Sequence, residues 1–531
     1  MIASFSHGSN QKSRGTQAEI PLFSSDLVTS VPPMSWLYHM NRNGANHLFH
    51  GSSVEVWTEG FFEGCFAGRW LTDDVTQCAE VFGSGLKIKN GVHHFITPSH
   101  TLESLFSFAQ SDQITLSNSL SFILEFHHLT LPLDLSYGAR FASVVLGVDA
   151  YQRELARVRG GHVSRIVFDN LRVNCDLSVE HVRKPMAPGF DDYKGYIAYL
   201  TRTLESAFSN AGTDVRRVRY APLATCSTGY DSAASAALAR DLGCRTAVTL
   251  RTSREDGADS GLAVGRALGM QVHEVERTDR AESFESVADF LSTGMGGEDY
   301  CYSRFAGFLN RRLLLTGFHG DKMWDVHAKP NTVLARGDIS GNSLQEYRLR
   351  LDFIHVPVPM IGARRHTEVT VISRSAEMEP FRIGTDYDRP IPRRVLEERG
   401  IPRGSFGQRK KAASLLLFLR PTLIPKPALA TKEWPSPSSA RIVGHSLAWT
   451  SRKLVASGLL RLWRRLQLPG SPAKLLVDEW RTFEHSHPGA VPNFLNALSI
   501  TRGRYRGVTP FLSQQASQVA CEEALAQVNL E

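Results

Sequence analysis

The chain has 531 residues, of which 42% are hydrophobic and 21% charged, and this composition excludes an intrinsically disordered protein and predicts two or three globular domains. Sixty Lys and Arg against 53 Asp and Glu give a net charge of +7, which favours anionic small molecules such as nucleotides; proteins that bind nucleic acid are usually more lopsided, so nucleic acid is not an expected partner. No stretch approaches the roughly 18 uncharged apolar residues of a membrane-spanning helix. Seven cysteines form no CxxC pair, which favours reduced thiols in a cytoplasmic protein.

The first third of the chain reads as β-rich. Residues 1–34 lack the apolar core of a signal peptide, and we interpret them as a flexible N-terminus. From about residue 35 to residue 172, short apolar runs alternate with turn residues, which predicts mostly strands. Asn90-Gly91 lies between two such runs and predicts a β-hairpin. We place the first domain at residues 35–195.

After residue 193 the pattern changes to alternating apolar strands and amphipathic helices, which is typical of an α/β protein with a parallel sheet. A helix is expected near 196–207, and Gly243 and Gly269 are expected to end two later helices as C-caps. We place this second domain at residues 196–425. The expected strands are 220–225, 246–250, 272–275 and 313–316, and the further expected helices are 231–242, 257–268, 284–291 and 304–309.

The last part of the chain, residues 426–531, opens with a link rich in Pro, Ser and Ala. It continues with a basic amphipathic segment at 446–468, which we interpret as a helix packed on the body by its apolar stripe, with a membrane-surface or partner helix as the alternative. The apolar run at 414–419 is interrupted by Arg420 and Pro421, which favours a core helix or strand. We therefore expect a helical extension after the second domain.

The segment Ser227 to Ser232, with the sequence STGYDS, lies between a predicted strand and a predicted helix. A loop of small residues there exposes backbone N–H groups, and the helix dipole favours an anion such as phosphate. Asp231 is suited to hold a Mg²⁺ ion that bridges phosphates. The residues alone leave an equal alternative, an ordinary helix cap in which Ser227 or Asp231 accepts backbone N–H bonds.

This segment resembles the SGGxDS loop of the PP-loop ATP pyrophosphatases, with Thr228 in place of a Gly. Residues 316–325, TGFHGDKMWD, are similar to the SGEGxDELFGG loop of the class B asparagine synthetases and their relatives, in which the Asp holds Mg²⁺. Asp321 matches that Asp, and Lys322 replaces the Glu that follows it. The stretch GIPRGSFGQRKKAAS resembles the segment that carries the catalytic Lys of this family; Lys410 matches best, and Lys411 and Arg409 stay open, as does a solvated basic face.

Two stretches of the first domain, 62–70 and 114–124, resemble parts of the glutaminase domain of the same family, the second of them a late strand. Active glutaminases of the family expose an N-terminal Cys, whereas this sequence begins Met1-Ile2. The resemblance therefore implies an inactive glutaminase-like domain, as in β-lactam synthetase.

Taken together, the resemblance implies a degenerate Ntn-hydrolase-like domain followed by a PP-loop synthetase domain. The implied activity is that of an ATP-dependent ligase, which adenylates a small-molecule carboxylate, releases pyrophosphate and forms an amide with an amine or ammonia. ATP and Mg²⁺ are the implied cofactors, and a homo-oligomer is left open. The implied nucleotide-binding residues are Ser227, Thr228, Gly229, Asp231, Ser232, Leu250 and Gly317; the implied metal ligands are Asp231 and Asp321; the implied catalytic residues are Lys410 and Glu298.

Glu298 and the neighbouring Asp299 follow a Gly-rich stretch, so an exposed loop with carboxylates is the alternative for this pair. Two other functions stay open for the whole chain. One is a PP-loop enzyme that modifies RNA. The other is a catalytically degenerate nucleotide-binding or scaffold protein, because Thr228 adds a side chain where backbone must approach phosphate and Lys322 reverses a charge.

Overall fold

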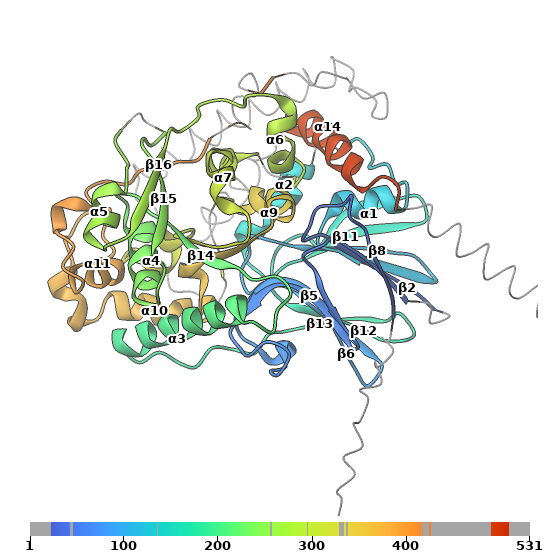
Figure 1. Ribbon diagram of the computed structural model, residues 1–531, viewed down its shortest axis with the longest axis horizontal. Helices are drawn as coiled ribbons and strands as arrows, with labels where there is room; N and C mark the ends of the chain where they lie inside the picture. The colour runs from blue at the N-terminus through green and yellow to red at the C-terminus, as the bar shows by residue number, and fades with distance from the viewer. Residues whose placement is uncertain are drawn as a thin grey trace, which may run out of the picture.

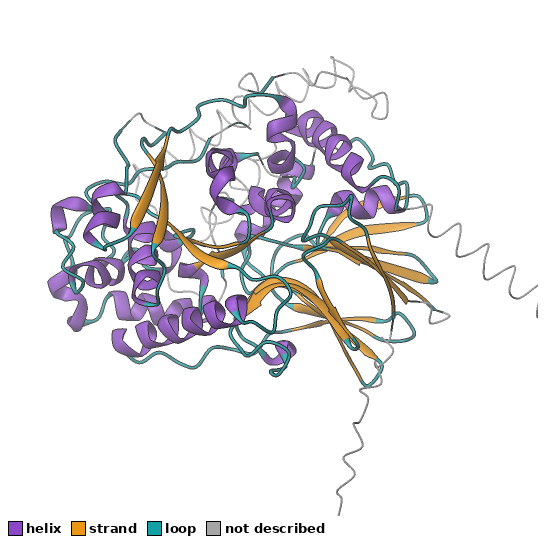
Figure 2. Ribbon diagram, in the orientation of Figure 1, coloured by secondary structure: helices purple, strands orange, loops and turns teal. Residues whose placement is uncertain are grey.

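The computed structural model describes residues 23–42, 46–134, 136–254, 257–294, 296–328, 334–335, 338–415, 417, 424–425 and 490–508. Two parts lie side by side in Figure 1: a pair of antiparallel sheets from the N-terminal region, and a parallel sheet surrounded by helices from the region after it. Colouring by secondary structure separates the same two parts (Figure 2). The fold is therefore α/β with a β-rich N-terminal region, as the sequence predicts.

The N-terminal part is a sandwich of two sheets. The first has the strand order β1 (Ser24–Leu27), β3 (Asn46–His50), β2 (Trp36–Asn41), β9 (Gln113–Ser117), β8 (Leu105–Ala109), β11 (Gly161–Ile166), β10 (Glu154–Val158). The second has the order β13 (Val179–Val182), β12 (Asn170–Val173), β7 (Val92–Ile96), β6 (Val81–Lys89), β5 (Gly60–Phe66), β4 (Glu55–Trp57). All paired neighbours are antiparallel except β1 and β3.

An aromatic core joins the two sheets. Strand alternation places Trp36 and Tyr38 of β2 on the same face, where both are fully buried. The Trp36 ring lies 5.0 Å from the ring of Phe61 in β5 and 6.3 Å from that of Phe95 in β7. These contacts cross from one sheet to the other, so burial of large aromatic surface stabilises the sandwich.

The turn between β6 and β7 confirms the predicted hairpin. Asn90 and Gly91 have φ angles of 50° and 76°, the left-handed conformation that a two-residue type I′ turn requires and that Asn-Gly tolerates. The stretch 114–124 is a strand only in its first half. β9 ends at Ser117, and α1 (Leu120–Phe126) follows because Ser119 caps it by accepting a hydrogen bond from the Phe122 N–H.

The expected flexible N-terminus is contradicted in part. Residues 1–22 lie outside the described residues, but β1, at residues 24–27, is an ordered edge strand that pairs with β3. Its side chains are mostly exposed, so it carries little of the hydrophobic pattern by which a strand is recognised from sequence.

The second part is a five-stranded parallel sheet. Its strand order is β16 (Gln271–Val275), β15 (Thr246–Leu250), β14 (Ala221–Thr225), β17 (Arg312–Thr316), β18 (Phe353–Pro357). The helices around it are α3 (Tyr193–Gly212), α4 (Tyr230–Asp241), α5 (Leu262–Ala267), α6 (Phe284–Leu291), α7 (Ala306–Leu309), α8 (Gly320–Met323), α9 (Gln345–Leu351), α10 (His366–Ser373) and α11 (Pro390–Glu397). β17 is buried along Leu313 to Thr316, as expected for a central strand covered on both faces.

The four predicted strands of this sheet are present, and β18 was not predicted. The helix expected at 257–268 begins only at Leu262, because Ala258 and Ser260 form isolated β-bridges with Thr252 and Ser227. The helix expected at 304–309 is likewise shortened to α7, which follows a 3₁₀ segment at Glu298–Phe305. Both differences arise beside the carboxyl ends of the strands.

At the C-terminal end the described residues form α14 (Ala490–Arg502), which packs against α1 and α6. The Arg502 guanidinium Nε lies 3.0 Å from a carboxylate oxygen of Glu125 in α1. The link after residue 425 and the basic segment predicted at 446–468 lie outside the described residues. Of the apolar run at 414–419, Leu415 and Leu417 are buried, and residues 416, 418 and 419 lie outside them.

A buried ion-pair network connects the two parts. Arg348 of α9 donates to both carboxylate oxygens of Glu63 in β5, over 2.7 and 2.9 Å, and its Nη2 lies 2.8 Å from Glu103. Arg348 and Glu63 are each at most 1% exposed. Such a network fixes the orientation of the sandwich against the α/β part, because breaking it would leave uncompensated buried charges.

Among the helices of the described residues, none combines the length and the apolar character needed to cross a bilayer. The described cysteines are all outside disulfide bonds.

Candidate active site

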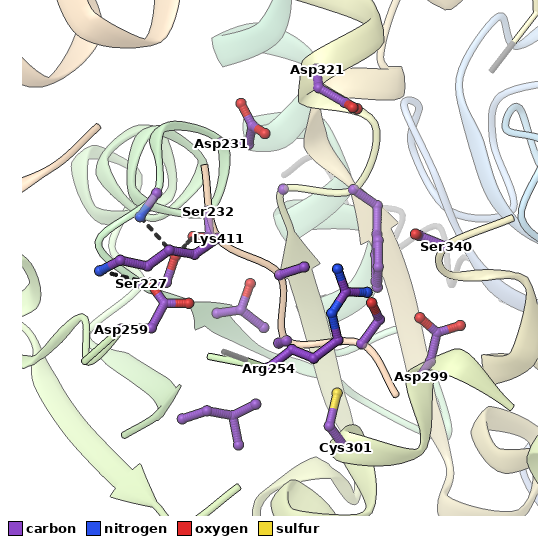
Figure 3. A pocket seen from close by; sticks show the side chains of 18 of the residues that line it. Ser227, Asp231, Ser232, Arg254, Asp259, Asp299, Cys301, Asp321, Ser340 and Lys411 are labelled. Atoms are coloured by element: carbon purple, nitrogen blue, oxygen red, sulfur yellow. Dashed lines mark hydrogen bonds and ion pairs between the residues drawn. The ribbon is translucent and has the colours of Figure 1, made fainter. Parts of the chain in front are cut away.

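The candidate site is a cavity of about 460 Å³ at the carboxyl ends of β14, β15 and β17. Parallel α/β sheets commonly bind ligands at this edge, where the strands give way to loops. Figure 3 shows labelled side chains from the loop after β14 and the start of α4, the loop after β15, the segment after β17 and the 3₁₀ segment at 298–305, together with Ser340 and Lys411 from later in the chain. The fold thus assembles the cavity from segments that are distant in sequence.

The loop after β14 leads into the start of α4, where the Tyr230 N–H donates to the Tyr387 hydroxyl over 3.4 Å. Gly229 is the N-cap residue of α4 and provides no side-chain cap. Ser227 Oγ accepts a hydrogen bond from the Gly229 N–H at 3.0 Å and lies 2.7 Å from Ser232 Oγ. Among the described residues, the Asp231 side chain accepts no backbone N–H bond at the helix start. The alternative of an ordinary helix cap is therefore supported only by the bond that Ser227 Oγ accepts from Gly229. An uncapped helix N-terminus with adjacent hydroxyls suits an anion.

Two glycines bring the loop after β17 against α4. A Cβ at Gly317 would lie 2.4 Å from the Ser232 backbone nitrogen, and a Cβ at Gly320 would lie 2.3 Å from the carboxyl carbon of Asp231. Any side chain at either position would therefore push this loop away. The close approach places Asp321, in the first turn of α8, beside Asp231, and the charge on Asp321 helps to raise the pKa of Asp231.

Asp231 and Asp321 have opposite electrostatic environments. Burial raises the pKa of Asp231 above its usual value, although Arg389 forms an ion pair with its Oδ2. Burial also opposes the charge on Asp321, but Lys322, Arg389 and Lys410 together outweigh it and lower its pKa. The Nζ atoms of Lys322 and Lys410 lie 2.8 and 3.2 Å from Asp321 Oδ2. Asp321 is therefore the more readily ionised member of the pair.

The donor atoms fit a hard divalent cation such as Mg²⁺. Asp231 Oδ1 is buried and accepts no hydrogen bond from any described residue, and Asp321 contributes a second carboxylate, the ligand type that Mg²⁺ prefers. A second grouping, His319, Asp321 and Asp338, has one ligand atom from each residue within 4.8 Å of the others. Lys322 lies 3.4 Å from Asp338, so protein cations neutralise both groupings in this structure.

Thr228 does not line the cavity. Its hydroxyl donates to Asp259 Oδ1 at 2.7 Å and accepts from Lys411 Nζ at 2.8 Å, so Thr228 is part of a hydrogen-bond network with Asp259 and Lys411. Thr228 was predicted as a nucleotide-binding residue; its side chain is held by Asp259 and Lys411, and a role in binding nucleotide stays a prediction. The same contacts hold its side chain away from the surface that Ser227 and Gly229 present.

The opposite end of the cavity contains two buried carboxyl groups. Asp299 accepts hydrogen bonds from Gly341 N and from Ser343 N and Oγ, and burial raises its pKa to about 6 despite these bonds. Glu298 is 3% exposed, and neither carboxylate oxygen has a hydrogen-bond partner among the described residues. Burial and the nearby Asp299 raise the pKa of Glu298 well above its usual value. The alternative of an exposed acidic loop is therefore wrong.

The cavity brings together most of the residues singled out from the sequence. Its lining includes Ser227, Gly229, Asp231, Ser232, Leu250, Glu298, Gly317, Asp321 and Lys410. Among the three neighbouring cations, Lys410 contacts Asp321, and Lys411 lines the cavity beside Thr228; Arg409 is not part of the lining.

Other cavity residues were not found by sequence reasoning. They include Arg254, Asp259, Tyr302, His319, Asp338 and Arg389. Arg389 is the most consequential because it pairs with Asp231, and yet it stands in the run TDYDRP just before α11, where nothing in the local pattern distinguishes it from a surface Arg. Its Nε also lies 3.6 Å from Asp325 Oδ2.

Comparison of the sequence with protein-family models finds no matching family, and a search of curated proteins finds no significant match. A functional assignment therefore depends on the residues and geometry of this cavity.

Proposed function

We propose that this chain is an asparagine-synthetase-like ATP-dependent ligase that forms an amide by way of an acyl-adenylate. The supporting observation is the cavity at the carboxyl edge of the parallel sheet, where the uncapped start of α4 lies beside Asp231, Asp321 and Lys410. In this proposal the parallel-sheet part is a PP-loop synthetase domain. The sandwich is a degenerate glutaminase-like domain of Ntn-hydrolase type, and the nitrogen comes from an amine or from ammonia.

Ser227 and Ser232 would bind the β- and γ-phosphates of ATP through their hydroxyl groups, and the Gly229 N–H would join them by exchanging its bond to Ser227 Oγ for a phosphate oxygen. Leu250, at the end of β15 and 7% exposed, would contact the adenine. Asp231 and Asp321 would hold Mg²⁺, which neutralises charge on the phosphates when it is bound. Lys410 contacts Asp321 and Arg389 contacts Asp231, and both cations would add positive charge as pyrophosphate leaves.

The reaction has two steps. An oxygen of the substrate carboxylate attacks the α-phosphorus of ATP, and the bond from that phosphorus to the bridging oxygen breaks and releases pyrophosphate. The amine nitrogen then attacks the acyl carbon, the acyl carbon–oxygen bond breaks, and AMP leaves. The proton lost by the amine needs an acceptor, and Glu298 lies in the same cavity. Fixed charges that are already in place reduce the cost of both steps.

One observation favours a second candidate, a nucleotide-binding or scaffold protein without catalysis. Arg389 is 2% exposed and forms an ion pair with Asp231, and Lys322 binds Asp321, so cations already engage both proposed metal ligands. In this alternative these ion pairs are permanent, and ATP either binds without turnover or does not bind.

The test is to measure AMP with pyrophosphate separately from ADP with phosphate, using Mg²⁺, ATP and a pool of candidate carboxylates. We expect AMP release that depends on the carboxylate and falls about 100-fold or more in Asp231→Asn, the scale for loss of one charge-stabilising group. Asp241→Asn, at the exposed far end of α4, is the matched control and should keep full activity. A folded protein that binds MgATP without forming AMP would support the scaffold alternative and refute the ligase.

A further inference from the structure

The candidate cavity has two ends of opposite charge. At one end, Lys410 and Lys411 lie near the start of α4. Glu298 and Asp299 form a separate acidic wall, and Asp338, which lies between this wall and Asp321, raises the pKa of both carboxyl groups through its charge. A ligand that fills the cavity therefore meets a basic region with its anionic part and an acidic region with another part.

Glu298 stands out among these acids because no described side chain pairs with it; only the backbone N–H groups of Gly296 and of Glu298 itself favour its charge. Asp299 is satisfied by Gly341 and Ser343, and Asp338 lies 3.4 Å from Lys322. Glu298 is 97% buried, as its exposed fraction of 3% implies, yet both of its side-chain oxygens lack a hydrogen-bond partner among the described residues. Leaving a buried carboxyl group unpaired is costly, so its retention at a cavity wall points to a ligand that supplies the partner.

The wall around this end is aromatic. The rings of Tyr302 and Phe318 stack with centroids 5.6 Å apart and an interplanar angle of 27°. Phe305 meets Tyr302 edge-on at 5.4 Å, and all three rings line the cavity. Faces of aromatic rings attract organic cations and pack against apolar or aromatic groups.

We propose that this end of the cavity, formed by Glu298 with Tyr302, Phe305 and Phe318, binds a primary ammonium group attached to an aromatic body. Glu298 accepts the ammonium N–H donors, and the rings cover the aromatic part. The role of this ligand rests on the proposed function: in the ligase, it is the amine that attacks the acyl-adenylate. The binding itself requires only the cavity.

Other ligand chemistries fit this end less well. The acidic groups repel phosphate and carboxylate. A hard divalent cation would need several free oxygen ligands, but the Asp299 carboxylate is already used by backbone and hydroxyl donors. An ammonium group needs fewer ligands, and one carboxylate with aromatic neighbours provides a suitable environment for it.

The experiment is calorimetric titration of the full chain with 2-phenylethylamine and, in parallel, with 2-phenylethanol, its neutral isostere. We expect the amine to bind at least about tenfold more tightly than the alcohol, the scale for a hydrogen-bonded charged group. Glu298→Gln, which keeps the shape and removes the charge, should abolish this preference. Glu285→Gln, a change at an exposed position in the first turn of α6, should leave it unchanged.

Equal binding of the amine and the alcohol, or an amine preference that survives in Glu298→Gln, would overturn the inference. Circular dichroism and thermal unfolding confirm that each variant is folded, so that lost binding reports the site. Because the titration contains no ATP, its outcome is separate from that of the AMP assay. A failed AMP assay with a Glu298-dependent amine preference would refute the ligase and keep the amine site; the reverse result would do the opposite.

Discussion

The domain interface and the candidate cavity both bury several charges, but they treat them differently. At the interface, Arg348 forms ion pairs with Glu63 and Glu103, and burial raises the pKa of Glu103 to about 7, so the charge of one arginine is shared with a carboxyl group that is readily protonated. In the cavity, Glu298 has no side-chain partner and Asp231 has one unpaired oxygen among the described residues. Paired buried charges fix structure, whereas unpaired charges in a cavity are available to a ligand at a cost in stability. Removing a charge should therefore lower the free energy of unfolding at the interface and raise it in the cavity.

The largest effect is expected at the interface. Arg348→Ala leaves Glu63 and Glu103 buried without their cation, and we expect the free energy of unfolding to fall by about 3–5 kcal/mol, measured by urea denaturation. Arg350→Ala, on the same helix, removes an ion pair with Asp289 whose Arg side chain is 38% exposed, and it should cost clearly less. Equal losses in the two variants would mean that burial of the network does not determine its importance.

The second effect concerns pH and Glu80, which connects the two parts by accepting hydrogen bonds from Gly362 N and Tyr199 OH. Burial raises its pKa from 4.5 to about 7. The folded state therefore binds more protons than the unfolded state between these values, and stability falls as pH rises through this window. Glu80→Gln removes this dependence.

From the shift in pKa, we expect the free energy of unfolding of Glu80→Gln, relative to that of the wild type, to be about 2.5 kcal/mol higher at pH 8 than at pH 5. Urea denaturation at both pH values measures this difference. Glu379→Gln, an exposed change whose Glu pairs with Arg382, serves as the control. A difference for Glu80→Gln that is independent of pH would contradict the assignment.

The third prediction is a gain in stability, at Glu298 in the cavity, where the first was a loss. Glu298→Met replaces an unpaired buried carboxyl group by an apolar side chain of similar length, and we expect unfolding to cost about 1–3 kcal/mol more. Glu63→Met, the same substitution at the interface, should destabilise the protein because it removes the main partner of Arg348. If both variants lost stability, Glu298 would be a structural residue, and the contrast between the two regions would disappear.

The smallest effect is expected outside both regions. Arg157 and Glu154 form an ion pair of 2.9 Å with side chains that are 84% and 48% exposed. Arg157→Ala should change the free energy of unfolding by less than about 0.5 kcal/mol, because solvent already screens the pair. Thermal and urea denaturation should both show this, and a larger loss would indicate that exposure is a poor guide to the value of ion pairs in this protein.

Local chemistry explains the elements that were predicted well. Asn90-Gly91 has the backbone freedom for its turn, and the apolar pattern of β15 and β17 is strong enough to identify buried strands. Prediction failed where partners distant in sequence decide the conformation. The start of α5 is delayed by bridges to Thr252 and Ser227, and β1 is a strand because β3 provides its pairing edge.

The candidate site also combines features set by the local sequence with features set by distant partners. The sequence by itself determined the loop at 227–232, because small residues between a strand and a helix produce an anion-binding loop through local backbone geometry. Asp321 was predicted too, from the resemblance of its own loop. Only the tertiary structure decided that Arg389 pairs with Asp231, that the Thr228 hydroxyl turns to Asp259, and that Glu298 is buried without a side-chain partner among the described residues. Burial and charge pairing depend on which distant segments meet, and no local pattern records that.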